Sequence, residues 1–194
     1  MKTIHLYLLA FLVFSVKGFC AEPSLEAKLG YFFFADSKMR KVYDEGGVDL
    51  QLSGSYPVWK WLHLYGSVEY LQRSGHSLSD HQKTDIWQIP VTVGLKGCVT
   101  ICSWASYYLT AGPRYFYVHV HNDSSYVDRN LDENGIGGFL GTGFSFFPYR
   151  HFLVDLFGEY SYERVHLNTS KRNVETKSMQ IGGFVVGIGL GYGF

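Results

Sequence analysis

Apolar and polar side chains alternate with a period of two along most of the chain after residue 22. The alternation is clearest near residue 50, where Val48 and Leu50 share one side and Asp49 and Gln51 share the other. A period of two places successive residues on opposite faces of a strand. The pattern predicts eight strands, over residues 25–34, 48–56, 62–70, 87–96, 107–117, 136–146, 152–163 and 179–194.

The intervals between these segments alternate strictly between long and short. Long intervals cover 36–46, 72–84, 119–135 and 163–177, and short ones cover 57–61, 97–102 and 147–151. An even number of strands with alternating loop lengths is typical of outer-membrane barrels, in which the short turns and both termini face the periplasm. Aromatic residues such as Trp59, Trp104 and Tyr192 gather near segment ends, as in the girdles at membrane interfaces. A soluble sandwich also alternates, with its apolar face buried.

The first 21 residues have the composition of a secretory signal peptide. Lys2 is followed by an apolar run over 4–16 and then by small residues near Ala21. We predict cleavage after Ala21, with Cys20 and Gly18 as alternative positions, and an uncleaved anchor as the alternative to cleavage. Phe19 is too bulky for a lipoprotein cleavage site before Cys20. The sequence therefore predicts a signal peptide over 1–21 and one exported domain over 22–194.

The last residues continue the alternation to the carboxyl terminus. Gly189, Tyr192 and Phe194 resemble the carboxyl-terminal insertion signal of outer-membrane barrels. Together with YYLTAGPRY at 107–115, the whole chain after residue 22 resembles the small barrels of the OmpA and OmpX type. The resemblance implies an all-β, eight-stranded, antiparallel up-and-down transmembrane barrel. It also implies insertion by the barrel-assembly machinery and contact with outer-membrane lipids and lipopolysaccharide.

In such a barrel, the apolar face meets lipid and the polar face points into a lumen that side chains can just fill. We expect a plugged interior held by ion pairs, since buried charges require partners. Arg114 is the expected hub, serving two carboxylates such as Glu69 and Asp155. A gated path for protons or ions is the alternative. The expected interior network is Glu26, Lys28, Asp49, His63, Glu69, Lys96, Arg114, Asp155 and Glu159.

Candidate chemistry is sparse. An outer-membrane lipid-modifying enzyme would use His with Ser and a carboxylate, and these residue types occur in the third and fourth long intervals without a motif that we recognise. We therefore expect neither catalysis nor a cofactor. The residues of these types are His119, His121, Asp123, Ser124 and Ser125, with His166 and Ser170.

Metal and disulfide signals are also weak. Asn130, Asp132, Asn134 and Gly135 resemble the start of a calcium loop, but Gly141 stands where that loop needs a bidentate Glu. His119 and His121 would share a strand face, without further ligands at recognisable spacing. Cys98 and Cys102 flank the expected short turn at 97–102, where either a disulfide or two thiols are compatible with the sequence.

The bulk charge excludes one class of partner. The chain has 17 basic and 17 acidic side chains, so it has no overall attraction for nucleic acid. The four long intervals carry formal charges of zero, plus one, minus three and plus two, in chain order. This mixture suits lipopolysaccharide bridged by divalent cations, pairing among the loops, or a host or envelope protein. A structural or surface-interaction barrel, a narrow channel and a lipid-modifying enzyme remain as alternatives.

Overall fold

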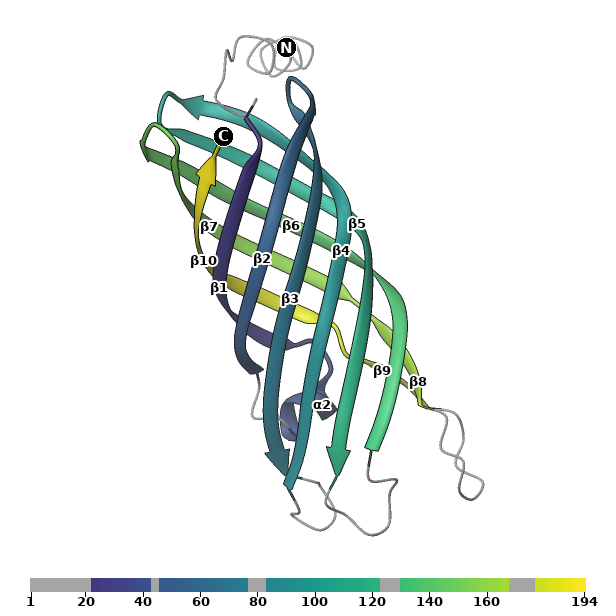
Figure 1. The fold of residues 1–194 in the computed structure, drawn as a ribbon. Helices are drawn as coiled ribbons and strands as arrows, with labels where there is room; N and C mark the ends of the chain where they lie inside the picture. Colours follow the sequence, from purple (N-terminus) through teal and green to yellow (C-terminus); the bar gives the residue numbers. More distant parts are fainter. Residues whose placement is uncertain (1–21, 43–45, 77–82, 123–129, 168–176) are drawn as a thin grey trace, which may run out of the picture.

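The computed structural model describes residues 22–42, 46–76, 83–122, 130–167 and 177–194, which form a closed antiparallel barrel of eight strands (Figure 1). The strand order around the barrel is β1-β10-β7-β6-β5-β4-β3-β2, which confirms the expected fold class. The barrel strands are β1 (Ser24–Phe34), β2 (Gly46–Trp59), β3 (Leu62–His76), β4 (Lys83–Cys102), β5 (Ala105–Asn122), β6 (Asn130–Tyr149), β7 (Phe152–Tyr162) and β10 (Gly183–Gly193).

The barrel closes between its first and last strands. β1 pairs with β10 from Ser24 opposite Gly193 to Phe34 opposite Gly183, and its other edge pairs with β2. The start of β1 and the carboxyl terminus lie at one end of the barrel, at the top of Figure 1. Three two-residue turns, at 60–61, 103–104 and 150–151, lie at that same end. We call it the short-turn end and the opposite end the long-loop end.

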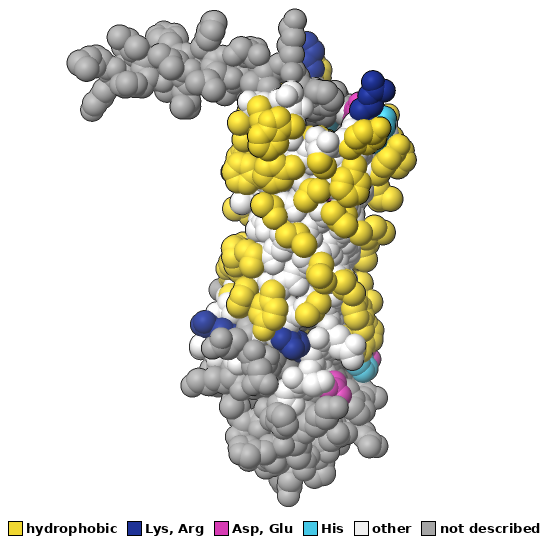
Figure 2. Space-filling model, turned by 90° about the vertical axis from the view of Figure 1, so that its left-hand side faces the viewer, with side chains coloured by type: hydrophobic (Ala, Val, Ile, Leu, Met, Phe, Trp, Pro, Cys, Tyr) yellow, Lys and Arg dark blue, Asp and Glu magenta, His cyan; other side chains and the backbone are white. Residues whose placement is uncertain are grey.

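The outer wall of the barrel is apolar, and its inner wall is largely polar. On β2, Leu50 and Leu52 are 53% and 55% exposed, whereas Asp49 and Gln51 are buried. Figure 2 shows outward hydrophobic side chains spread over the face of the barrel wall that is in view. So much apolar surface is stable only against lipid, which reverses the sidedness of a soluble sandwich. Among the described residues, no helix is long and apolar enough to cross a membrane.

Several strands are longer than their alternation predicts. β4 and β6 each contain 20 residues and β5 contains 18, so they extend into the expected loops at 72–84 and 119–135. At the other end, most of the expected turn residues 57–61, 97–102 and 147–151 also belong to strands. The hydrogen bonds between paired strands need only backbone groups. Strand pairing therefore continues beyond the part of the outer wall that carries the exposed hydrophobic side chains, which we call the apolar belt.

The expected long intervals also contain regular structure. Residues 36–46 include a one-turn-and-a-half helix, α2 (Ser37–Val42), and residues after 163 begin a separate hairpin of β8 (Arg164–Leu167) and β9 (Lys177–Gln180). The expected last strand over 179–194 is therefore two elements. Met179 pairs with Val165 in the hairpin, and the barrel strand begins at Gly183.

Cys98 and Cys102 do not flank a turn. Both lie on β4, opposite Tyr108 and Ala105, and the turn follows them at 103–104. Two residues four positions apart on one strand have Cα atoms about 13 Å apart. A disulfide requires Cα atoms about 4.4–6.8 Å apart, so of the two alternatives that the sequence leaves open, a bridge between these cysteines does not fit their positions on one strand. The two sulfurs form no disulfide in the structure.

Candidate functional site in the barrel interior

All nine expected interior residues are buried inside the barrel, and none is more than 4% exposed. They come from strands on several sides of the barrel, and each lies at an inward-facing position of its strand. The interior divides into three regions. A balanced ion cluster lies toward the short-turn end, and a cluster around Arg114 lies further along the lumen. A group of buried apolar side chains, which we call the apolar cap, lies at the long-loop end.

The balanced cluster pairs two carboxylates with two ammonium groups. Lys28 Nζ lies 2.9 Å from Asp155 Oδ2 and 3.3 Å from Glu26 Oε2, and Lys96 Nζ lies 3.0 Å from Glu26 Oε1. The Tyr108 hydroxyl donates a 2.6 Å hydrogen bond to Asp155, and both ammonium groups lie near the Tyr108 ring. Each buried charge in this cluster therefore has an opposite charge in contact, as burial in a low-dielectric interior requires.

The Arg114 cluster gathers one guanidinium and several carboxylates. Both terminal nitrogens of Arg114 bond to the Glu69 carboxylate, and its Nε donates to Thr92 Oγ1 at 2.9 Å. Glu159 lies 3.8 Å and Glu163 3.9 Å from the guanidinium. Arg114 thus serves Glu69 as expected, but its further partners are Glu159 and Glu163, because Asp155 lies in the other cluster with Lys28.

Glu163 was not among the expected interior residues, although its signal was present. It continues the inward phase of Asp155 and Glu159 on β7 and is 1% exposed. Glu163 ends the expected strand 152–163 and also begins the expected interval 163–177. His63 contacts Ser55 Oγ at 3.5 Å, near a small cavity at the short-turn end.

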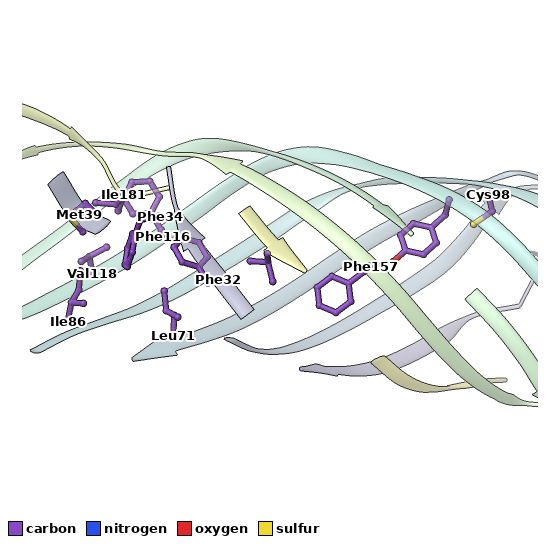
Figure 3. Close-up of a cluster of buried hydrophobic side chains, with 12 residues drawn as sticks. Phe32, Phe34, Met39, Leu71, Ile86, Cys98, Phe116, Val118, Phe157 and Ile181 are labelled. Carbon is purple, nitrogen blue, oxygen red and sulfur yellow. The ribbon is translucent and has the colours of Figure 1, made fainter. Parts of the chain in front are cut away.

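The apolar cap is a feature that the sequence did not predict. Met39 of α2 is 5% exposed and meets Phe34, Phe116 and Ile181 at the long-loop end, as the left side of Figure 3 shows. Phe157 and Cys98 lie apart from this group, toward the short-turn end. Phe34 and Phe116 lie at inward-facing positions of strands, whereas Met39 lies on a helix inside an interval that we expected to be a loop. In such an interval, the alternation typical of strands cannot predict which side chains enter the lumen.

Glycines on the inner wall make room for the large interior side chains. A Cβ at Gly143 would lie 2.5 Å from the Tyr108 hydroxyl, and one at Gly189 would lie 2.9 Å from Cγ of Lys28. Gly187 stands opposite Gly30, and a Cβ there would lie 2.8 Å from the Phe157 ring. The glycine-rich segments 136–146 and 179–194 therefore form parts of the wall against which the interior side chains pack.

A separate polar group lies on the outer wall, just beyond the apolar belt. Asp132 Oδ1 lies 2.5 Å from His119 Nδ1 and accepts a 2.7 Å hydrogen bond from the Tyr117 hydroxyl. The Trp87 ring stacks near both His119 and Tyr117, at 5.2 and 5.3 Å. The hydrogen bonds with His119 and Tyr117 lower the pKa of Asp132. The bond between Tyr117 and Asp132 raises the pKa of the Tyr117 hydroxyl.

The segment that resembles the start of a calcium loop is part of a strand. Residues 130–135 belong to β6 and pair with β5 over residues 116–121, so they are extended rather than looped around an ion. Among the described residues, no group of three or more His, Cys, Asp or Glu side chains is arranged to hold a metal ion. Asp123, Ser124, Ser125 and Ser170 lie outside the described residues, and only the backbone is described at His121 and His166.

The expected insertion signal lies on the closing strand. Tyr192 and Phe194 point outward, are 50% and 65% exposed, and stack edge to face with ring centroids 5.3 Å apart. Gly189 faces the lumen against Lys28 and Asp155. The Phe194 amide donates to the Pro23 carbonyl, which ties the carboxyl terminus to the residue before β1.

No family model matches the sequence, and no curated protein matches it. Solved structures do match the fold. Neisserial surface protein A has a TM-score of 0.61 at 15% identity, covering 89% of this chain and 97% of its own. The outer membrane protein OprG from Pseudomonas aeruginosa has a TM-score of 0.59 at 15% identity, and the match covers 93% of this chain and 99% of OprG. A third match is Ail, the attachment invasion locus protein of Yersinia pestis, in complex with the heparin analogue sucrose octasulfate. It has a TM-score of 0.54 at 18% identity, and the match covers 88% of this chain and 97% of Ail.

The barrel, its apolar belt and these similarities define the class of the protein. The chain has the fold of the small eight-stranded outer-membrane β-barrels, as its resemblance to the OmpA and OmpX type implied. Its apolar outer wall and its largely polar inner wall are the two faces of its alternating strands.

Proposed function

We propose that the chain is an outer-membrane protein with a structural or surface-interaction role and a plugged, non-conducting interior. The filled lumen carries this proposal. The ion pairs of Lys96 with Glu26 and of Lys28 with Asp155 join different strands inside the barrel. Arg114 and its carboxylates lie further along the lumen, and the buried apolar group around Met39 lies at the long-loop end. A steady ionic current would require these packed groups to separate.

We further propose that the signal peptide at 1–21 directs export, and that both termini and the short turns lie in the periplasm. Tight turns at the end that holds the termini support this orientation. The exposed Tyr192 and Phe194 support insertion by the barrel-assembly machinery. The apolar belt would contact lipids and lipopolysaccharide, and the long loops would contact host or envelope proteins. Ail, an attachment protein with this fold, is a precedent for a surface role.

The proposal includes no enzymatic activity and no cofactor. The nearest approach to a catalytic arrangement is the His119–Asp132 pair, which contacts the Tyr117 hydroxyl and the Trp87 ring. A lipid hydrolase or acyltransferase also needs a nucleophile within hydrogen-bond reach of its base. Mass spectrometry of lipid A after overexpression should show unchanged acyl chains, and a change that His119→Ala abolishes would contradict this part of the proposal.

Conductance tests the plugged interior directly. Purified wild-type protein in a planar lipid bilayer should give no steady channel current. Tyr108→Ala combined with Phe157→Ala removes two rings from the middle of the lumen and serves as a matched variant in which leakage should rise. Steady single-channel steps in the wild type would favour the narrow channel instead.

Localisation needs its own experiment. The protein should fractionate with the outer membrane, and its mobility on a gel should change when it is heated in detergent, because the folded barrel resists detergent until heated. A soluble protein without heat-dependent mobility would overturn the outer-membrane assignment.

A further inference from the structure

The interior charges of the described barrel do not balance, and the excess lies in one place. Six carboxylates and three cations are buried in the lumen. The cluster near the short-turn end is neutral, because Glu26 and Asp155 face Lys28 and Lys96. The Arg114 cluster contains the rest, with one guanidinium facing four carboxylates: Asp49, Glu69, Glu159 and Glu163. If all four were ionised, this cluster would have a formal charge of minus three.

The four carboxylates differ in how well they are compensated. Glu69 receives two bonds from Arg114 and further ones from Gln51 Nε2 and Ser67 Oγ. Glu159 receives the Gln51 amide at 3.2 Å. Asp49 is 2% exposed, and its Oδ2 accepts no hydrogen bond. Glu163 is 1% exposed, and its Oε1 likewise accepts none, with the guanidinium no nearer than 3.9 Å.

Donors are too few to compensate these oxygens. The Gln51 amide nitrogen lies within 3.4 Å of Glu69, of both Glu159 oxygens and of the Tyr65 hydroxyl, although it carries only two hydrogens. The Nε hydrogen of Arg114 is directed to Thr92. An ionised carboxylate buried without a partner costs several kcal/mol, so such a group takes up a proton or a cation instead.

A proton is the ligand that this geometry favours. The described carboxylates do not form a group arranged to hold a metal ion. A protonated carboxyl, in contrast, supplies the hydrogen-bond donor that the cluster lacks. We propose that the Arg114 cluster is a proton-binding site, in which Asp49 and Glu163 are neutral carboxylic acids at neutral pH. Glu69 is the ionised partner of Arg114.

The groups that face these two carboxyls come from most of the barrel wall. Asp49 on β2 is flanked by Gln51 on its own strand, and Glu159 and Arg114 are the charged groups that act on it. Glu163 faces Arg114 and packs over Gly137 of β6. Glu69 of β3 and Lys28 of β1 complete the charged surroundings of the cluster. Because the folded state would hold two protons that the unfolded chain gives up near pH 4, stability should fall as the pH rises above about 4 and should level off once the folded state has also lost both protons.

Amide substitutions test the site, because an amide has the shape of a neutral carboxyl. Asp49→Asn and Glu163→Gln should each leave the folding equilibrium constant within about tenfold of the wild-type value at neutral pH. The matched controls are Asp155→Asn and Glu26→Gln, which remove needed charges from the balanced cluster. Each control should lower the constant by about a hundredfold or more. Urea unfolding in lipid vesicles measures all four.

Infrared spectroscopy of the folded wild type supplies a second readout. The C=O stretching band of a protonated carboxyl should be present at neutral pH and should be lost in the double variant Asp49→Asn with Glu163→Gln. Absence of the band from the wild type would overturn the proposal. So would stabilisation of the wild type, but not of the double variant, by added Na⁺, Mg²⁺ or Ca²⁺, since a metal ion would then balance the charge.

The inference rests on the plugged interior proposed above, and the two can fail separately. A channel current in the wild type contradicts the proposed function. A non-conducting barrel without the carboxyl band contradicts the proton site alone.

Discussion

The Tyr108 hydroxyl of β5 donates a 2.6 Å hydrogen bond to Oδ2 of Asp155 on β7, the same oxygen that lies 2.9 Å from Lys28 Nζ of β1. This single carboxylate therefore joins three strands that are distant in sequence. Ser145 Oγ of β6 donates to its other oxygen at 3.2 Å. Asp155 is completely buried, so these partners replace the water that its charge would otherwise hold.

Removing the Tyr108 hydroxyl should destabilise the barrel. Tyr108→Phe leaves the packing of the ring but removes a hydrogen bond to a buried charge, which typically costs about 1.5–3 kcal/mol. The free energy of unfolding in urea measures the loss. Tyr115→Phe, on the lipid-facing side of the same strand, is the control and should change stability by much less. Equal effects of the two substitutions would mean that the bond to Asp155 contributes little.

Arg114→Ala should lower thermal stability more than Lys96→Ala. Arg114 compensates Glu69 and lies near two further carboxylates, whereas Glu26 retains Lys28 at 3.3 Å when Lys96 is removed. Leaving a buried charge without its partner costs about 3–5 kcal/mol. Melting of the purified variants in detergent, followed by circular dichroism, gives the comparison. Equal and negligible losses would argue against an interior held by these pairs.

Gly187→Ala should disturb the barrel wall under Phe157. Its Cβ would lie 2.2 Å from the Leu29 carbonyl oxygen and 2.6 Å from the Gly30 Cα, which are backbone atoms and cannot rotate away. Overpacking of this kind costs about 1–3 kcal/mol. Gly138→Ala is the control, because nothing lies within 4 Å of a Cβ at Gly138. Urea unfolding should separate the two, and a neutral Gly187→Ala would show that the strands can part without cost.

The Asp132 carboxyl should titrate at lower pH than an ordinary aspartate. Hydrogen bonds from His119 and Tyr117 hold its pKa below the usual value. Because the folded value is depressed, this contribution to stability is present above the unfolded pKa of Asp132 and is lost as the pH falls through the folded one. Tyr117→Phe removes one donor and should raise the pKa of Asp132, as measured by NMR titration of the carboxyl carbon. An unchanged titration would exclude the Tyr117 bond as a cause.

The sequence alone determined the architecture of this protein. The alternation of apolar and polar residues over stretches such as 48–56 identified the two faces of each strand. The alternation of long and short intervals between the strands indicated their up-and-down order. Both signals are local, because a lipid-facing residue and a lumen-facing residue must alternate wherever the backbone is extended. The same phase placed Glu26, Asp155 and Arg114 inside the barrel.

Only the tertiary structure decided which of these side chains meet. Asp155 pairs with Lys28 rather than Arg114, and Glu163 joins Arg114, because pairing across the lumen depends on strand stagger and tilt, which alternation does not encode. The apolar cap includes Met39, which lies in an interval expected to be a loop. Cys98 and Cys102 are far apart because β4 extends as far as Cys102. Backbone pairing set these strand ends, and it extends beyond the apolar belt that the sequence pattern records.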